Sequence, residues 1–136
     1  MRSGALGGPV VLDAEGLSRA VRKHPYLQAV FAEARDSRVP VVVSAATLVE
    51  VMHLRIDRAA WRWTLLTIRI EPVTRAIAES AADLLMATGR GGHAHALDAI
   101  VAATALGLPG HATIFTSDPG DLRGLVGCRA TVVALR

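Results

Sequence analysis

The chain has 136 residues, of which 51% are hydrophobic, and its formal net charge is +3. This length suits one domain with a real core, and no apolar run reaches the roughly 18 residues of a membrane-spanning helix. The glycine-rich start is too short for a signal peptide, and a single cysteine excludes an internal disulfide. We therefore expect a soluble, cytoplasmic protein with a flexible extension at residues 1–8 and one domain at residues 9–136.

Short apolar runs alternate with helix-length segments, which is typical of an α/β fold with a mainly parallel sheet. About five strands are predicted, at residues 9–13, 39–44, 69–73, 112–116 and 130–135. Helices are predicted at residues 17–23, 26–36, 45–56, 58–66, 76–88, 95–106 and 118–125. The helix over 76–88 should bury a face of Ala78, Ala81, Ala82 and Leu85, and the almost wholly apolar helix over 95–106 should be central. The expected architecture is one α/β/α sandwich.

Four carboxylates stand at the turning points of this pattern. Asp13 and Asp118 follow apolar strands, whereas Glu50 and Asp98 lie within apolar helical segments. Acids in such settings are costly unless they are paired, hydrogen-bonded or bound to a cation. Ligands of open parallel sheets bind beyond the carboxyl ends of the strands, and all four acids could face that edge. Clustered carboxylates suit Mg²⁺ or Mn²⁺, and one or two such ions could activate water and polarise a phosphoryl group.

Each acid also has a purely structural interpretation. Asp13 could cap the helix that follows it, and Asp118 before Pro119 is a good N-cap. Asp98 lies near a helix start, where the helix dipole favours an acid, and Glu50 could point to solvent from an amphipathic helix. The joint placement of the four around one predicted edge favours a site.

Other chemistries have weaker support. No glycine-rich nucleotide-binding loop follows the first strand, and no serine stands in a Gly-x-Ser-x-Gly elbow. His93 and His95 are interpreted as polar loop residues, Trp61 and Trp63 as core or interface residues, and Cys128 as a small apolar filler at the head of a strand. Fourteen of the 15 basic residues are arginine, which suits phosphate backbones but equally fits a biased base composition of the source genome.

Four segments carry a resemblance to a known family. They are VVLD at residues 10–13, SAATLVEV at 44–51, HALDAIVAATA at 95–105 and IFTSDPGDL at 114–122. In this order and at this spacing the chain resembles the PIN-domain ribonucleases, in particular the VapC-type toxins of type II toxin–antitoxin pairs. The resemblance extends over nearly the full length, and it implies a PIN domain at residues 9–136.

By position, the resemblance assigns the acids to a catalytic quartet that binds Mg²⁺ or Mn²⁺. Its members are Asp13, Glu50, Asp98 and Asp118. Asp121 matches a further acid of the family, which could bind metal or only support the helix cap.

Two more positions matter in this comparison. Thr116 matches the hydroxyl residue that precedes the last acid. Glu15 departs from the pattern, because many members have Ser, Thr or Asn there. A fifth acid could raise the local negative charge, hydrogen-bond a metal-bound water or swing out to solvent.

The resemblance implies an endoribonuclease that leaves a 3′-hydroxyl and a 5′-phosphate. It also implies a homodimer and a small cognate antitoxin, which often places an arginine in the acidic site. We expect the antitoxin to cover the helices after the first two strands, at Leu17, Val21, Tyr26, Val30, Met52 and Ile56. RNA would need basic contacts on the rim, with candidates at Arg19, Arg22, Lys23 and Arg90.

Two alternatives stay open at this stage. The first is a catalytically silent PIN-like module that binds RNA or protein. The second is a receiver-like signalling domain, for which the sole lysine, Lys23, is misplaced.

Overall fold

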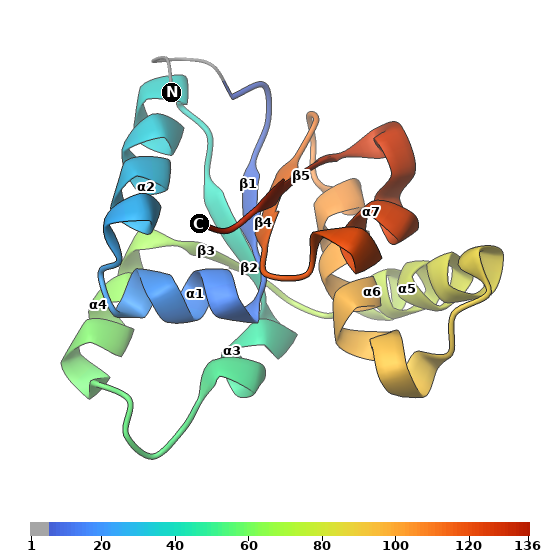
Figure 1. Cartoon of the computed structure of the whole chain (residues 1–136), viewed down its shortest axis with the longest axis horizontal. Coiled ribbons are helices and arrows are strands. Elements are labelled where there is room, and N and C mark those ends of the chain that lie inside the picture. The colour runs from blue at the N-terminus through green and yellow to red at the C-terminus, as the bar shows by residue number, and fades with distance from the viewer. Residues whose placement is uncertain (1–5) are drawn as a thin grey trace.

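The computed structural model describes residues 6–136, which form a five-stranded sheet in the order β3-β2-β1-β4-β5 (Figure 1). The strands are β1 (Val10–Leu12), β2 (Val41–Ser44), β3 (Arg69–Glu71), β4 (Thr113–Thr116) and β5 (Thr131–Ala134). All four neighbouring pairs are parallel. The expected α/β fold with a sheet of about five strands is therefore confirmed, and the sheet is parallel throughout.

Within residues 6–136, seven helices and one 3-10 turn accompany the strands. They are α1 (Ala14–Val21), α2 (Pro25–Ser37), α3 (Ala45–Val51), α4 (Arg58–Thr67), α5 (Arg75–Thr88), α6 (Gly92–Gly107), α7 (Pro119–Val126) and η1 (Gly127–Arg129). The helix expected over 45–56 is wrong beyond Val51. His53 Nδ1 accepts a hydrogen bond from Arg55 N, and Asp57 Oδ1 accepts one from Ala60 N at the start of α4. Such side-chain bonds compete with helix continuation, so a loop separates α3 from α4.

The two faces of the sheet bury different helices, because successive strand residues point to opposite faces. Val10 and Leu12 face the core cluster that contains α1 and α2, whereas Val11 faces the cluster that contains α6 and α7. Figure 1 shows these helices on opposite sides of the sheet. The expected α/β/α sandwich thus follows from the alternation within three-residue and four-residue strands.

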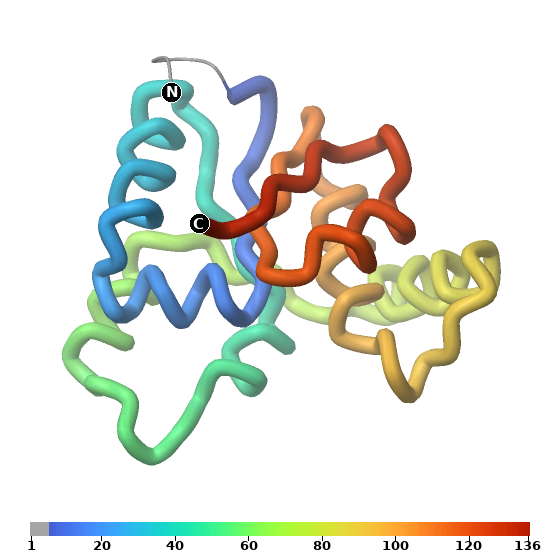
Figure 2. Tube along the Cα trace, viewed as in Figure 1, coloured from blue at the N-terminus to red at the C-terminus, as the bar shows by residue number. Residues whose placement is uncertain are grey.

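Helix α5 packs mainly on α6, and the two form a hairpin away from α2 and α4 (Figure 2). Gly89 ends α5 in the left-handed conformation, with φ 68°. Ala81 and Leu85 face α6 as expected, but Ala78 and Ala82 are exposed, and Ile77 and Leu84 take their place. The α5 residues that pack on α6 are therefore spaced by four and three positions, at Ile77, Ala81 and Leu84. Because α6 covers the sheet, α5 has only one narrow face to bury.

Helix α6 is central only in its second half. Ala99 and residues 101–105 are buried, but Leu97 is 42% exposed. The helix starts at Gly92, three residues before the expected start, and its buried residues begin only at Ala99. Cys128 is exposed in η1, so its interpretation as an apolar filler is wrong. The exposure arises because Cys128 lies in the η1 turn that precedes β5.

Part of the predicted N-terminal extension, residues 1–5, lies outside the described residues. Leu6 donates its backbone N–H to Ser37 Oγ at 3.1 Å, and Gly8 is buried against the backbone of His111. Within residues 6–136, no helix combines the length and the apolar character needed to cross a membrane.

Candidate metal centre at the carboxyl edge of the sheet

Asp13 lies directly after β1 and is held from three directions. Its Oδ1 accepts a hydrogen bond from Gly16 N at 2.9 Å, which caps α1. Its Oδ2 accepts bonds from Thr116 Oγ1 at 2.7 Å and from Ser117 N at 3.1 Å. The side chain is only 8% exposed. Asp13 therefore has the capping role that its position suggested, and its carboxylate is also fixed to the end of β4.

Thr116 connects two of the acids. Leu12 pairs with Phe115 in the β1–β4 register, so Asp13 and Thr116 stand side by side at the carboxyl ends of their strands. The buried Thr116 hydroxyl donates to Asp13 and accepts from Asp118 N at 2.8 Å. The hydroxyl position thus holds Asp13 and the backbone of Asp118 in one hydrogen-bonded arrangement.

Two more acids, Glu50 of α3 and Asp98 of α6, lie close enough to Asp13 for their charges to interact. Burial raises the pKa of Asp98, and the negative charges of Asp118, Asp121 and Asp13 raise it further. Burial also raises the pKa of Glu50, with smaller contributions from Asp13 and Asp98. Glu50 stands on the last turn of α3 and is exposed, so the expected embedding in an apolar helix face is wrong. Its carboxylate nevertheless lies within the field of the other acids.

Asp118 and Asp121 meet at the start of α7. A side-chain hydrogen bond with Asp121 raises the pKa of Asp118, and burial and the charges of Asp121 and Asp13 act in the same direction. Asp118 occupies the N-cap position of α7, yet its side chain caps no backbone N–H in the described part of the chain. Capping therefore fails to account for Asp118, whose carboxylate belongs to the acidic cluster instead.

Five carboxylates from the β1–α1 junction, α3, α6 and the β4–α7 segment therefore lie near one edge of the sheet, where their charges affect one another, and oxygen atoms of Asp98 and Asp121 lie within 4.8 Å of each other. Three of them have raised pKa values: burial is the largest cause for Glu50 and Asp98, a side-chain hydrogen bond with Asp121 is the largest for Asp118, and the neighbouring negative charges add to each shift. A divalent cation relieves the repulsion between these charges, and oxygen donors are what Mg²⁺ and Mn²⁺ prefer. The donor set fits the expected metal.

His95 is a member of this cluster that the sequence interpretation missed. It lies in α6 rather than in a loop, so that interpretation is wrong; the helix begins at Gly92, within the glycine run. A ring nitrogen of His95 and one carboxylate oxygen each of Asp98 and Asp121 lie within 4.8 Å of one another. The three-residue spacing of His95 and Asp98 on one helix was the available signal.

Glu15 is occupied elsewhere. Its Oε1 accepts a hydrogen bond from Arg19 Nε at 3.0 Å and lies 3.4 Å from Arg22 Nη2. Arg19 also donates to the backbone carbonyl of Arg136 at 2.6 Å. Glu15 thus pairs with Arg19 and Arg22, and Arg19 connects α1 to the C-terminal residue. Arg19 and Arg22, both candidate RNA contacts, are therefore engaged with Glu15.

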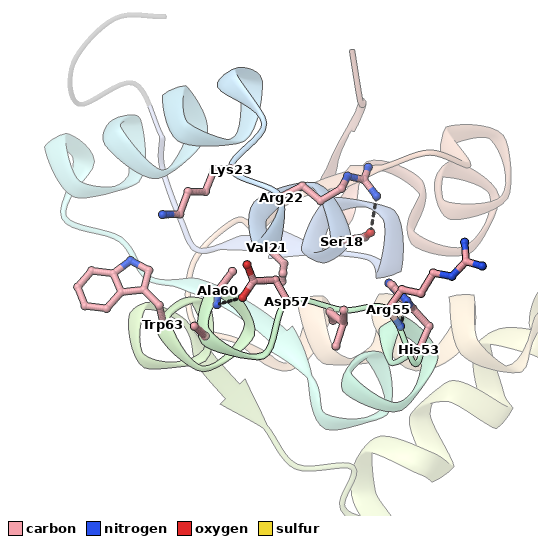
Figure 3. Close-up of a pocket in the computed structure, with 11 residues that line it drawn as sticks. Ser18, Val21, Arg22, Lys23, His53, Arg55, Asp57, Ala60 and Trp63 are labelled. Carbon is pink, nitrogen blue, oxygen red and sulfur yellow. Dashed lines mark hydrogen bonds between the residues drawn. The ribbon is translucent and has the colours of Figure 1, made fainter.

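A separate groove of about 710 Å³ lies between α1, α4 and the loop that joins α3 to α4 (Figure 3). Val21, Ala60 and Trp63 give it apolar walls, and Trp63 is 63% exposed. Its basic lining comes from Arg22, Lys23, His53 and Arg55. None of the five clustered acids lines this groove, so the molecule has two distinct surface features.

The apolar surface expected for a partner is only partly present. Leu17 and Val30 are fully buried in the core, so their predicted exposure is wrong. Both helices use these residues to cover the sheet. Tyr26 is half-buried and packs edge-on against Phe115, with ring centroids 6.2 Å apart. Two of the expected residues remain at open surface, Ile56 in the groove and the exposed Met52, whereas Val21 borders the groove but is only 5% exposed and belongs to the core.

The fold and the acidic edge together define an α/β domain with a PIN-like architecture. No family model matches the sequence, and no curated protein matches it. Among solved structures, the chain is similar to a chain of "Crystal structure of VapBC2 from Rickettsia felis bound to a DNA fragment from their promoter". The TM-score is 0.67 and the identity is 14%, over 94% of this chain and 99% of that chain. At this identity the likeness shows the fold.

Proposed function

We propose that this protein is a metal-dependent endoribonuclease and the toxin of a type II toxin–antitoxin pair. The observation that carries the proposal is the placement of Asp13, Glu50, Asp98, Asp118 and Asp121 at the carboxyl edge of a parallel sheet. There Asp13 is hydrogen-bonded to Thr116 at the end of β4, and oxygen atoms of Asp98 and Asp121 lie within 4.8 Å of each other. Ligands of such sheets bind at this edge. The PIN-like fold and the crystallised VapBC2 complex as a structural neighbour support the same function.

In this proposal the five acids have different roles at the metal. Asp13, Asp98 and Asp118 hold Mg²⁺ or Mn²⁺, Glu50 completes the set from the exposed rim, and Asp121 is a further contact. When bound, the ion would lower the pKa of a water molecule and polarise the phosphoryl group of RNA. Thr116 is a positioning residue, because its hydroxyl fixes the Asp13 carboxylate.

The ribonuclease proposal is tested with purified protein, labelled RNA and Mn²⁺. We expect Asp98→Asn to abolish cleavage, since it removes a charged oxygen ligand from the centre of the cluster. Asp83→Asn, which changes an exposed aspartate on α5, is the matched control and should cleave normally. If Asp98→Asn cleaves as well as the wild type, the assignment fails. If wild-type protein binds Mn²⁺ but leaves RNA intact, the silent PIN-like module is favoured instead.

We further propose that the groove of Figure 3 receives the antitoxin. Its apolar walls suit an amphipathic helix, and its basic lining suits acidic side chains. A second copy of the chain, as in a homodimer, would use other exposed apolar residues, such as Leu66 and Met86.

Ala59→Arg tests this docking site, because it places a bulky charge at an exposed groove position. Co-expressed with the product of an adjacent reading frame, this variant should lose the partner on purification. Ala87→Arg, at an exposed position of α5, should retain it. Retention of the partner by Ala59→Arg would exclude the groove.

A further inference from the structure

We propose that His95 is a direct nitrogen ligand of the metal and makes the centre prefer Mn²⁺ to Mg²⁺. The inference rests on the proposed metal centre, but it changes the chemistry of that centre from all-oxygen to mixed nitrogen and oxygen.

The first argument is the state of the ring nitrogen. Nδ1 of His95 is buried and has no hydrogen-bond partner in the part of the chain that the structure covers, although the side chain as a whole is 28% exposed. Buried polar atoms are nearly always satisfied, so an orphan nitrogen calls for a missing partner. The nearest acidic atom, Asp121 Oδ2, is 3.9 Å away, which is too long for a hydrogen bond.

The second argument is distance. Two ligands on opposite sides of an octahedral ion with bonds of about 2.1 Å lie about 4.2 Å apart. The 3.9 Å between His95 Nδ1 and Asp121 Oδ2 is shorter than this limit. The candidate atoms of His95, Asp98 and Asp121 all lie within 4.8 Å of one another. One ion can therefore contact all three after small side-chain adjustments.

The third argument is the origin of the arrangement in the sequence. Residues three apart on a helix are surface neighbours, so His95 and Asp98 of α6 present imidazole and carboxylate to the same place. Carboxylate and histidine at this spacing supply metal ligands in helical di-iron proteins. Asp121 lies on α7, which packs on α6, and supplies the third candidate ligand.

A nitrogen ligand changes metal selectivity. Both ions favour oxygen ligands, but Mn²⁺, a first-row transition metal, accepts an imidazole nitrogen more readily than Mg²⁺, which is held by oxygen ligands and water. The contact with His95 should therefore strengthen binding of Mn²⁺ more than binding of Mg²⁺.

The experiment measures Mn²⁺ binding to the full chain without RNA, by electron paramagnetic resonance, together with Mg²⁺ competition. We expect ¹⁴N hyperfine coupling from a directly bound imidazole in the wild type. His95→Gln should lose that coupling and bind Mn²⁺ at least about tenfold more weakly, with a smaller change for Mg²⁺. His93→Gln, two residues earlier on α6 and exposed, is the matched control and should keep both.

The outcomes separate the two proposals. Mn²⁺ binding that Asp98→Asn abolishes, but that shows no nitrogen coupling, overturns the role of His95 and leaves the metal centre intact. Coupling that persists in His95→Gln also overturns it. Failure of the wild type to bind Mn²⁺ at millimolar concentration overturns both.

Discussion

Repulsion within the acidic cluster should lower the free energy of unfolding of the metal-free protein. Asp98→Asn removes one of the repelling charges and should therefore raise that free energy. Asp98 has three acidic neighbours, Asp118, Asp121 and Asp13, and each raises its pKa after burial has done so. The side chain is half-buried, so each repulsion belongs to the weak, solvent-screened class. At about 0.3 kcal/mol each, the three sum to roughly 1 kcal/mol.

The neutral amide should therefore stabilise the apo protein at pH 7. For a domain of this size, roughly 1 kcal/mol corresponds to a rise in Tm of about 3–5 °C. The pKa of Asp98 in the folded protein is raised above its ordinary value of 3.8. The stability that protonated Asp98 contributes is thus fully present below pH 3.8 and is lost as the pH rises through the pKa of Asp98 in the folded protein. The advantage of Asp98→Asn should vanish near pH 4.

Metal should reverse the order of stability. Mn²⁺ at a hundredfold excess over its Kd stabilises a binding protein by about 2.7 kcal/mol, which exceeds the gain from removing repulsion. Thermal unfolding monitored by circular dichroism, with and without Mn²⁺ at pH 4 and pH 7, measures all four cases. Asp83→Asn serves as the control and should show neither effect. An Asp98→Asn gain that is absent at pH 7, or equal at both pH values, would refute the electrostatic argument.

Substitutions at three other positions test the surrounding structure. Thr116→Val should lower the free energy of unfolding in urea by about 1–3 kcal/mol, because it removes one of the three donors to the buried Asp13 carboxylate, whereas Thr116→Ser should retain most of the stability. Equal loss in both variants would contradict this role. Glu15→Gln should cost less than about 1 kcal/mol, since its arginine pairs are partly solvated. It should also leave Mn²⁺ affinity unchanged by calorimetry, and a marked loss of affinity would place Glu15 in the centre after all. Asp57→Ala should cost about 1 kcal/mol in the same urea assay through loss of the cap on Ala60 N, and no change would show that α4 starts without it.

The sheet and its acidic edge could be predicted because each depends on local sequence and one topological rule. Runs such as residues 10–12 and 41–43 are apolar on both faces, which identifies strands of a covered parallel sheet. Once the strands are parallel, the acids that follow them share an edge. Asp13 and Asp118 follow from this rule without knowledge of any side-chain contact.

Other features depend on tertiary packing and were predicted incorrectly. An apolar residue on an amphipathic helix faces either the core or a partner, and periodicity cannot distinguish the two; Leu17 and Val30 face the core. His95 was misplaced because a glycine run usually ends structure, whereas Gly92 here begins α6. The contact of His95 with Asp121 depends on how α6 packs against α7, which no local pattern encodes.

The structural and functional interpretations of Asp13 are complementary. A carboxylate oxygen has two lone pairs, and Asp13 Oδ2 uses both, one for Thr116 Oγ1 and one for Ser117 N. Oδ1 uses one for Gly16 N and retains the other. Asp13 can therefore contact an ion through Oδ1 alone, in an orientation that the helix cap and the β4 hydroxyl already fix. In the proposed centre, the cap that gives Asp13 its structural role would also preorganise it as a ligand, because a fixed carboxylate loses little conformational freedom when it binds.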